Sequence, residues 1–363
     1  MKKKILILAQ TPPPFHGQSI MQQYLVEAKW PWCQKIHIRM DFSEKIDAVT
    51  RFNFSKVLKL FRIIILLFKE RLKGPIDIIY YPPSGPHRVS FYRDLILVPF
   101  IKLFSIKVVF HFHSGGFNQI PEKFNFIEIA LAKIVYYKPE LAIALLPSLE
   151  DEVQWIAPKK IIHIPNGIED VFDAAKKKSG KKDFVVLFVG NLIEEKGIVT
   201  LVEAMKKIGN NIPVKLKLIG GWRSKELKKQ VEDNLVKYNL QNSVEFAGIK
   251  NGEEKWKYFN EADIFCLPTF ETEAMPITII EAMMFGLPVI TTNWRAIPDI
   301  IQDGADGMLI PVKDPDALAA KIIELFENKE LRAKLGNNAR INYLKSFRIE
   351  NHLKEMEKAF KQL

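Results

Sequence analysis

Short apolar runs alternate with amphipathic, helix-like segments along the whole chain, and this alternation predicts parallel β-sheets covered by helices on both faces. In the first half, the runs that predict strands are Ile5–Ala9, Lys35–Arg39, Asp77–Tyr81, Lys107–Phe112 and Leu141–Leu145. In the second half, the same pattern returns at Phe184–Val189, Val214–Ile219, Val244–Ala247, Ile264–Leu267 and Val289–Thr292. The pattern therefore predicts an α/β protein with two similar sheets.

A polar, charge-dense stretch separates the two halves. Residues 173–183 show no apolar periodicity and are interrupted by glycine, as in a linker. A chain of 363 residues, 48% of them hydrophobic, can bury two cores. We therefore expect a first domain over 1–172 and a second over 184–346, with a C-terminal helix over 347–363 that packs back on the first domain.

One loop and helix in the second half bring two carboxylates together. A helix is expected to start near Pro276 and to stop at Gly286, since proline suits the first helical position and glycine suits a helix end. Helical side chains lean toward the N-terminus of their helix, so Glu281 leans back toward the loop that carries Glu273. Carboxylates and unpaired backbone N–H groups suit a ligand with hydroxyls and anionic oxygens. From this stretch alone, a buried helix with two ordinary surface glutamates fits equally well.

A second loop lies at the same edge of the same predicted sheet. Gly190, Asn191 and Lys196 follow the strand Phe184–Val189 and precede another helix. A cation beside a helix N-terminus makes an anion site, although a lone lysine at a turn is usually a surface residue. The neighbouring carboxylates favour the anion site.

The loops of the first half are rich in turn and polar residues. Gly17 would let the backbone approach a phosphate or sugar closely. His111 and His113 alternate, so they face one side if the strand continues there. No third ligand stands at a recognisable spacing from this pair, which disfavours a metal site.

The net charge of +11 predicts anionic partners but does not choose among them. Nucleic acid ranks low, because the chain lacks a nucleic-acid-binding signature. Residues 55–73 predict an apolar helix edged with basic side chains, which fits either a membrane interface or a core helix with a solvated edge.

The ends and the cysteines indicate a cytoplasmic protein. The N-terminal apolar run is too short for a signal peptide and predicts a first strand. No apolar run reaches the roughly 18 residues of a membrane span. Cys33 and Cys266 form no metal or redox spacing, so each is expected to be a small buried thiol.

Three motifs together resemble the retaining nucleotide-sugar-dependent glycosyltransferases of the GT-B fold, family 4 group. Gly190–Gly197 resembles the family's Gly-Arg-Leu…Lys-Gly phosphate loop. Glu273 and Glu281 match its Glu-x7-Glu signature, and Pro165–Ile168 is similar to its Pro-Asn-Gly-Val segment. The resemblance covers about residues 160–315, while the first half resembles the family only in layout.

The resemblance implies two Rossmann-like domains whose parallel sheets face a central cleft, with the donor held mainly by the second domain. Lys196 would pair with the diphosphate, Glu281 would hold the ribose hydroxyls and Glu273 the hydroxyls of the transferred sugar. The positions matching the family's remaining donor contacts are Gly17, Asn191, Ile249, Ala274, Met275 and Ile277. Pro276 lies among them but has no N–H to offer.

The resemblance further implies a catalytic set of Glu273, Lys196 and His113, with His111 and His87 as competitors for the histidine's role. Asn191 departs from the family, which usually has arginine there, so one neutral donor replaces a bidentate charged clamp on phosphate. Lys196 or Arg88 could compensate for this loss.

The implied activity is transfer of a hexose-type sugar from a nucleotide diphosphate sugar to a hydroxyl acceptor, with retention of configuration and no metal or cofactor. Polysaccharide or lipid-linked glycan synthesis is the expected setting, with the protein in the cytoplasm or peripheral on the inner face of the plasma membrane. A GT-B epimerase, a phosphorylase and a non-catalytic nucleotide-sugar-binding protein stay open as alternatives.

Overall fold

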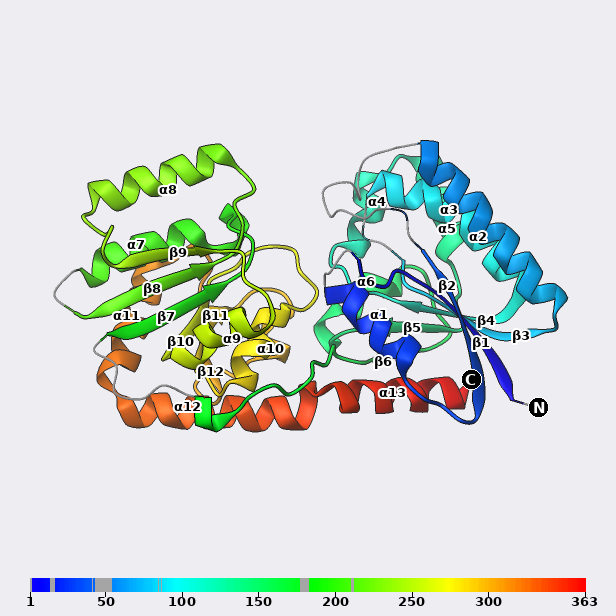
Figure 1. Cartoon of the computed structure of the whole chain (residues 1–363). Helices are drawn as coiled ribbons and strands as arrows, with labels where there is room; N and C mark the ends of the chain where they lie inside the picture. Colours follow the sequence, from blue (N-terminus) through cyan, green and yellow to red (C-terminus); the bar gives the residue numbers. More distant parts are fainter. Residues whose placement is uncertain are drawn as a thin grey trace. The chain divides into compact units, whose positions relative to one another are not determined.

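Two six-stranded parallel sheets organise the chain in the computed structural model (Figure 1), which confirms the expected α/β class. The structure describes residues 2–13, 17–40, 42, 54–83, 85, 87–176, 183–209 and 212–363. They divide into two units, each with its own sheet. Unit 1 comprises Met1–Gly167, Ile349–Leu363 and the short segment Glu273–Met275, and unit 2 comprises Ile168–Thr272 and Pro276–Arg348.

The sheet of unit 1 has the strand order β2-β1-β3-β4-β5-β6, and all its neighbouring strands are parallel. Its strands are β1 (Lys3–Ala9), β2 (Cys33–Arg39), β3 (Ile76–Tyr81), β4 (Ser105–His111), β5 (Leu141–Ala144) and β6 (Ile161–His163). The first five confirm the predicted strands to within a few residues at each end. β6 was not predicted, because an edge strand of three residues leaves no measurable alternation.

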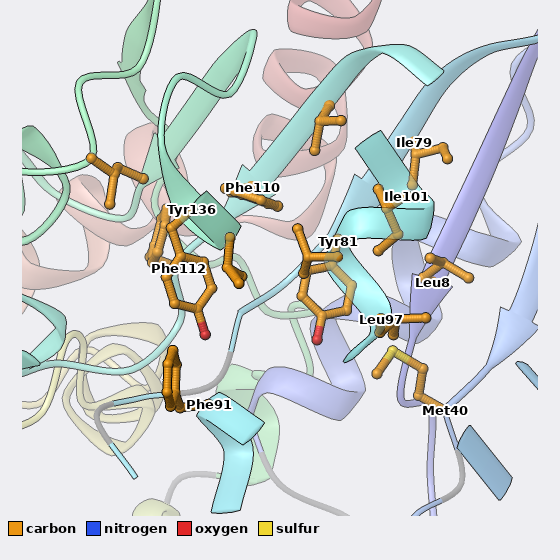
Figure 2. Close-up of a cluster of buried hydrophobic side chains, with 14 of the residues drawn as sticks. Leu8, Met40, Ile79, Tyr81, Phe91, Leu97, Ile101, Phe110, Phe112 and Tyr136 are labelled. Atoms are coloured by element: carbon orange, nitrogen blue, oxygen red, sulfur yellow. The ribbon is translucent and has the colours of Figure 1, made fainter. Parts of the chain in front are cut away.

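Helices cover both faces of this sheet. They are α1 (Gly17–Glu27), α2 (Phe54–Leu72), α3 (Arg88–Phe104), α4 (Ile120–Lys123), α5 (Phe126–Tyr136), α6 (Asp151–Gln154) and α13 (Ile349–Gln362), with 3-10 turns at Phe117–Gln119 and Pro147–Leu149. The buried residues of α2, α3 and α5 share one core with one face of the strands. Figure 2 shows the centre of this core, where the rings of Tyr81, Phe110 and Tyr136 lie side by side.

The opposite face of this sheet is covered by α1 and α13. Met356 and Phe360 of α13 share a second core with Ile5 and Tyr80 of the strands. The ring of Phe360 lies 5.5 Å from that of Trp30 and 6.1 Å from that of Tyr80. The last helix of the chain is therefore a structural part of unit 1.

The sheet of unit 2 has the order β12-β11-β10-β7-β8-β9 and is also parallel throughout. Its strands are β7 (Phe184–Val189), β8 (Val214–Ile219), β9 (Val244–Gly248), β10 (Ile264–Leu267), β11 (Val289–Thr292) and β12 (Gly307–Ile310). The five predicted strands match almost residue for residue. The unpredicted strand, β12, is again a short edge strand.

The helices of unit 2 are α7 (Ile198–Ile208), α8 (Lys225–Lys237), α9 (Gly252–Glu261), α10 (Ile277–Met284), α11 (Pro315–Glu327) and α12 (Lys329–Asn342). Shorter helical turns lie at Ala174–Lys176, Glu194–Lys196, Ile297–Asp299 and Tyr343–Phe347. Across the described residues of both units, no helix combines the length and the apolar character that crossing a bilayer requires.

The division between the units falls between Gly167 and Ile168, before the linker expected at 173–183. Ile168 belongs to unit 2 because its N–H donates to the carbonyl of Phe347 (3.0 Å) and its carbonyl accepts from the hydroxyl of Tyr343 (3.0 Å). Residues 177–182 of the expected linker lie outside the described residues.

Candidate functional site

The strand order of unit 2 singles out one place at the carboxyl edge of its sheet. β7 and β10 are neighbours, but the chain leaves β7 toward β8 and β9 and leaves β10 toward β11 and β12 (Figure 1). In parallel sheets, ligands bind where the strand order reverses in this way, because the two connections diverge. The loops that follow β7 and β10 carry Lys196 and the carboxylates singled out in the sequence.

The loop after β7 holds Lys196 at the start of a helix. Lys196 ends a 3-10 turn, and Gly197 caps α7 in the left-handed region at a φ of 80°. A Cβ on Gly197 would lie 2.2 Å from the carbonyl oxygen of Pro268, so only glycine permits this approach of the two loops. The Lys196 side chain is 7% exposed and forms an ion pair with Glu271 at 2.9 Å.

The two loops are joined by backbone groups as well. The carbonyl of Glu195 accepts hydrogen bonds from the N–H of Phe270 (2.7 Å) and the hydroxyl of Thr269 (3.1 Å). Because these bonds fix one loop against the other, the position of Lys196 relative to Glu271 is set by the backbone.

Side chains at the end of β11 and just after it hold the second loop from its other side. The hydroxyl of Thr291 donates to the backbone carbonyl of Leu267 at 2.8 Å. The hydroxyl of Thr292 donates to the backbone carbonyl of Thr269. The indole N–H of Trp294 donates to the carbonyl of Glu271 at 3.1 Å. Alternate carbonyls of the loop are thereby satisfied, and both threonines are fully buried.

Glu281 lies inside the short helix that follows this loop. It is 7% exposed, and its Oε1 is 2.6 Å from Nζ of Lys255 on α9. Burial raises the pKa of the Glu281 carboxyl, and the neighbouring Lys255 opposes that rise. Oε2 is buried and accepts no hydrogen bond from the described residues. The carboxylate is held on one oxygen and can accept from a ligand hydroxyl on the other.

Lys255 is itself fixed on both sides. Its ammonium lies 4.2 Å from the centroid of the Trp256 ring, and that ring stacks on Phe285 at 5.6 Å. The side chain is 17% exposed. A lysine between an aromatic face and a carboxylate is held in a defined position.

One small correction concerns the start of the helix that carries Glu281. Pro276 is the N-cap of α10, with ψ at 105°, and not its first helical residue. The helix ends at Met284, and Gly286 follows it in the left-handed region, as expected for a stop signal. Ile277 is the first helical residue.

The remaining donor-site candidates of unit 2 lie on neighbouring loops. Asn191 is exposed, directly after Gly190. A Cβ on Gly220 would lie 1.8 Å from the carbonyl oxygen of Gly190, so the loops after β7 and β8 touch through their backbones. Ile249 is 70% exposed and packs beside Gly221.

The other candidates group with unit 1. Glu273, Ala274 and Met275 fall in that unit although the chain on either side of them belongs to unit 2. Gly17 is the first residue of α1. Each of these positions stays a prediction.

Three histidines of unit 1, His111, His113 and His352, lie together beside Tyr80. The hydroxyl of Tyr80 lies 2.9 Å from Nδ1 of His111 and 3.5 Å from Nε2 of His113. The two imidazole centroids are 3.9 Å apart, and His352 lies 6.2 Å from His111. Burial lowers the pKa of His111 well below its usual value, and that of His352 to about 4.

These histidines differ in their access to a ligand. His111 is 1% exposed, whereas His113 is half-buried beyond the end of β4. The following loop is anchored by Glu152, whose carboxylate accepts from the backbone N–H groups of Gly116 (2.9 Å) and Asn118 (3.1 Å). His87 is exposed just before α3.

Arg88, expected as a substitute cation for phosphate, is engaged elsewhere. Its guanidinium pairs with Glu128 at 3.1 Å and donates to the carbonyl of Lys123 at 3.0 Å. Among the residues that the structure describes, no group of three or more histidine, cysteine or carboxylate side chains is arranged to hold a metal ion.

Sequence reasoning missed Glu271 and Lys255, the ion-pair partners of the two central residues. Glu271 lies in the same loop as Glu273, so its place at the sheet edge was available from the pattern. Lys255 gave no signal, because it sits among several lysines and glutamates on a polar helix. Only the packing of α9 against the rest of unit 2 brings it to Glu281.

Comparison with known proteins identifies the second half of the chain. Residues 171–342 match the family described as glycosyl transferases group 1. A stretch covering 47% of the chain is 31% identical to a phosphatidyl-myo-inositol mannosyltransferase of Mycolicibacterium smegmatis and spans 44% of that protein. An uncharacterized glycosyltransferase of Methanocaldococcus jannaschii is 32% identical over 49% of the chain and 48% of its own length. The chain thus spans about half the length of these curated relatives.

Solved structures match over the full length. The sucrose-phosphate synthase of Thermosynechococcus elongatus superposes with a TM-score of 0.75 and 21% identity, covering 99% of both chains. Anabaena HepE in complex with UDP gives 0.76 and 16%, covering 99% of this chain and all of the other. Residues 171–342 thus belong to the glycosyl transferases group 1 family, and the chain as a whole has the GT-B fold.

Proposed function

We propose that this protein is a retaining glycosyltransferase that moves a hexose-type sugar from a nucleotide diphosphate sugar to a hydroxyl acceptor. The observation that carries the proposal is the pair of loops at the β7/β10 switch point of unit 2. They place a buried ammonium, two helix N-termini and a buried carboxylate with an open oxygen on one sheet edge. This combination complements a diphosphate joined to a diol.

The names of the similar proteins support this assignment. HepE structures contain UDP and UDP-glucose, and the relative from Mycolicibacterium smegmatis is a mannosyltransferase. Another relative, from Salmonella typhimurium, is named a putative colanic acid biosynthesis glycosyltransferase. A hexose donor and a role in polysaccharide or lipid-linked glycan synthesis are therefore the natural proposals for this chain.

In the proposed reaction, the acceptor oxygen attacks the anomeric carbon from the side of the leaving group. The bond between that carbon and the diphosphate oxygen breaks as the new glycosidic bond forms, and the acceptor proton passes to the departing phosphate oxygen. Lys196 and the N-termini of α7 and α10 stabilise the charge that grows on the diphosphate. The proposal therefore requires no metal or cofactor.

Glu281 and Glu273 bind hydroxyls in this scheme. Glu281 accepts from the ribose diol through its open oxygen, while Lys255 holds the other oxygen and keeps the carboxylate charged. Glu273 holds hydroxyls of the transferred sugar, so it is not the nucleophile of a double displacement as in retaining glycosidases. By the family resemblance, His113 would contact the reacting sugar and Gly17 the diphosphate. The protein would act in the cytoplasm.

Lys196 is already paired with Glu271, so an incoming diphosphate competes with a carboxylate. Glu271 is one-third exposed and can turn into solvent when phosphate oxygens take its place. The positive charge is thus kept in position before the donor arrives, without a full desolvation cost.

A panel of nucleoside diphosphates and nucleotide sugars in a thermal-shift assay tests the donor assignment. A ligand that binds only the folded protein stabilises it by RT ln(1 + [L]/Kd), or about 2.7 kcal/mol at a hundredfold excess over Kd. Glu281→Ala should reduce the shift caused by the best ligand and abolish sugar transfer. The matched control is Glu261→Ala, which breaks another ion pair of unit 2, with Lys217 at 3.0 Å.

The outcomes separate the alternatives. Full transfer activity in Glu281→Ala would refute the site. Donor binding without transfer to any acceptor extract would indicate a non-catalytic binding protein. Consumption of nucleotide sugar without an acceptor, or only with free phosphate, would indicate an epimerase or a phosphorylase.

A further inference from the structure

The outward surface of α2, α3 and α5 in unit 1, which we call the three-helix face, is unusually apolar. α3 packs against both α2 and α5, and the inward residues of all three helices join the same core (Figure 1). Their outward residues should then be polar, since a helix on the surface of a globular protein is amphipathic. They are not.

α2 carries two apolar stripes. The inner stripe is buried in the core and consists of Leu60, Ile63, Ile64 and Leu67. The outer stripe recurs at intervals of three and four residues and consists of Leu58 (60% exposed), Phe61 (57%), Ile65 (55%), Phe68 (41%) and Leu72 (85%). Phe68 packs on Phe100 of α3 at 6.0 Å, but the outer stripe as a whole lies outside the core of unit 1.

The neighbouring helices extend this surface. α3 exposes Tyr92, Ile96 and Leu103, and α5 exposes Phe126, Ile127, Ile134 and Tyr137. The corresponding large exposed side chains of unit 2 are fewer and scattered: Val171, Val236, Ile249, Ile341 and Leu344. Large apolar patches on a protein surface mark interaction sites, whereas scattered single residues do not.

Charge on the three-helix face has one sign. The carboxylates in these helices are Glu70, Asp94 and Glu128, and each is turned inward. Glu70 pairs with Lys4 at 3.3 Å, Asp94 accepts from the hydroxyl of Tyr136 at 2.8 Å, and Glu128 pairs with Arg88.

The exposed charged side chains among the apolar residues are basic. Arg62, Lys69 and Arg71 flank the outer stripe of α2, and Lys133 stands among the exposed residues of α5. Interleaved aromatic, aliphatic and basic groups without exposed acids match the boundary between anionic headgroups and acyl chains.

We propose that the three-helix face docks unit 1 on the surface of an anionic phospholipid bilayer. The apolar side chains would enter the acyl boundary, and the basic side chains would bind phosphate headgroups. A second copy of the chain is a poorer occupant, because two faces of the same charge repel each other. Nucleic acid is also a poorer occupant, because it would leave the exposed apolar side chains in contact with water. The inference extends beyond the single amphipathic helix expected from the sequence and does not depend on the proposed catalysis.

Flotation of the full chain with vesicles tests the proposal. Binding is expected to vesicles of phosphatidylcholine and phosphatidylglycerol, to weaken with salt, and to be far weaker to pure phosphatidylcholine. Replacing Arg62, Lys69, Arg71 and Lys133 by glutamine should weaken binding on the order of a thousandfold, since the four basic groups near such a surface together contribute about 4 kcal/mol. The control replaces Lys225, Lys229, Lys237 and Lys334 of unit 2 by glutamine.

A second variant tests the apolar contribution. Leu72→Ser, Leu103→Ser and Phe126→Ser together remove one exposed apolar side chain from each helix, and all three are more than two-thirds exposed, so folding should be unaffected. Binding should fall at least about tenfold. The control combines Val171→Ser, Val236→Ser and Ile341→Ser in unit 2.

Insertion depth gives an independent readout. Both native cysteines, Cys33 and Cys266, are buried, so a cysteine introduced by Leu103→Cys can be labelled selectively with an environment-sensitive fluorophore. Brominated lipids should quench this label but not the same label introduced by Val236→Cys.

Several results would overturn the proposal. One is equal binding of the wild type to neutral and anionic vesicles, and another is unchanged binding in both multiple variants. A third is a self-associating wild type whose oligomers dissociate in the serine variant while vesicles remain unbound. That last result would assign the face to contact between copies of the chain.

Discussion

The two sheets of this protein have the same class and the same number of strands, yet their functional loops carry different chemistry. In unit 2, two ion pairs at hydrogen-bond distance, Lys196–Glu271 and Lys255–Glu281, lie beside the switch point. In unit 1, His111 and His352 lie in a polar cluster with Tyr80 and His113, and burial lowers the pKa of both, which disfavours their charged forms. The same kind of sheet thus supports two ion pairs in one unit and a histidine cluster in the other.

The difference shows what each unit can bind. A buried ion is tolerated only with a partner, so the pairs of unit 2 hold charges in place for a ligand that carries phosphate and hydroxyls. The histidine cluster of unit 1 offers hydrogen bonds. We interpret the charged site as the donor site and the histidine cluster as the acceptor side, and the following variants test this comparison in order of expected effect.

Lys196→Ala should have the largest effect, because it removes the cation proposed to stabilise the leaving diphosphate. Sugar transfer is expected to fall about a hundred- to thousandfold, which equals about 3–4 kcal/mol of transition-state stabilisation. Steady-state kinetics with the donor found in the thermal-shift screen would measure it. Lys206→Ala, at the far end of α7, is the control, and an equal loss there would point to a general effect on the helix.

Lys255→Met should destabilise unit 2 by about 2–3 kcal/mol at neutral pH, because Glu281 loses its ion pair with Lys255 and stays buried. The pKa of Glu281, already raised by burial, would rise further without Lys255. Below about pH 4 the Glu281 carboxyl is neutral in both the folded and the unfolded protein, so the variant should lose little stability there. The loss of stability should grow as pH rises through the pKa of Glu281 in the folded protein. Urea unfolding at several pH values measures this dependence.

The double variant Lys255→Met, Glu281→Gln completes that test. Removing both charges should restore much of the stability, because no buried ion is left unpaired. If the double variant were as unstable as the single one, packing of the lysine chain rather than charge would explain the loss.

Asn191→Arg should increase nucleotide affinity by adding a positive charge to the proposed donor site. An exposed arginine after β7 can form charge-assisted bonds to phosphate, which are worth about 1 kcal/mol more than a neutral bond and should strengthen nucleotide affinity up to roughly tenfold. Calorimetric titration with the nucleoside diphosphate measures this change. Asn242→Arg, on the opposite edge of the same sheet, is the control, and weaker binding in Asn191→Arg would contradict the assignment of this loop.

Substitution of His352 tests the histidine cluster of unit 1. Its pKa of about 4 in the folded protein lies below the usual 6.5, so the unfolded chain takes up the proton first and stability falls as pH drops below about 6.5. The loss should reach about 1 kcal/mol at pH 5.5 and continue toward pH 4. His352→Asn, which keeps a donor for the carbonyl of Pro165, should flatten that slope. His87→Asn, at an exposed position, should leave it unchanged.

The sequence predicted the central strands of both sheets and the helix that carries Glu281, because buried parallel strands are continuous apolar runs. It missed β6 and β12, since a short edge strand is only partly enclosed and its pattern is too brief. The units divide at Gly167, where the pairing of Ile168 with Phe347 joins residues far apart in the chain, while the linker expected at 173–183 stays a prediction.

The residues of the candidate site likewise fall into those that the sequence predicted and those that it missed. Lys196, Glu273 and Glu281 were accessible from spacing, as each follows a predicted strand. The partners were not, because Lys255, Thr291, Thr292 and Trp294 reach the site only through the packing of other elements. The three-helix face was anticipated on α2 alone. Its extension to α3 and α5 depends on which sides of those helices the core leaves exposed.

The place of α13 in unit 1 has a consequence for how the chain is made. Unit 2 emerges as one stretch that only Glu273–Met275 of unit 1 interrupts, whereas the core beside Trp30 and Tyr80 must wait for Met356 and Phe360. Since domains fold as units during synthesis, the half encoded first is finished last. Until α13 has been synthesised, that half presents an unfilled apolar surface of the kind that chaperones bind.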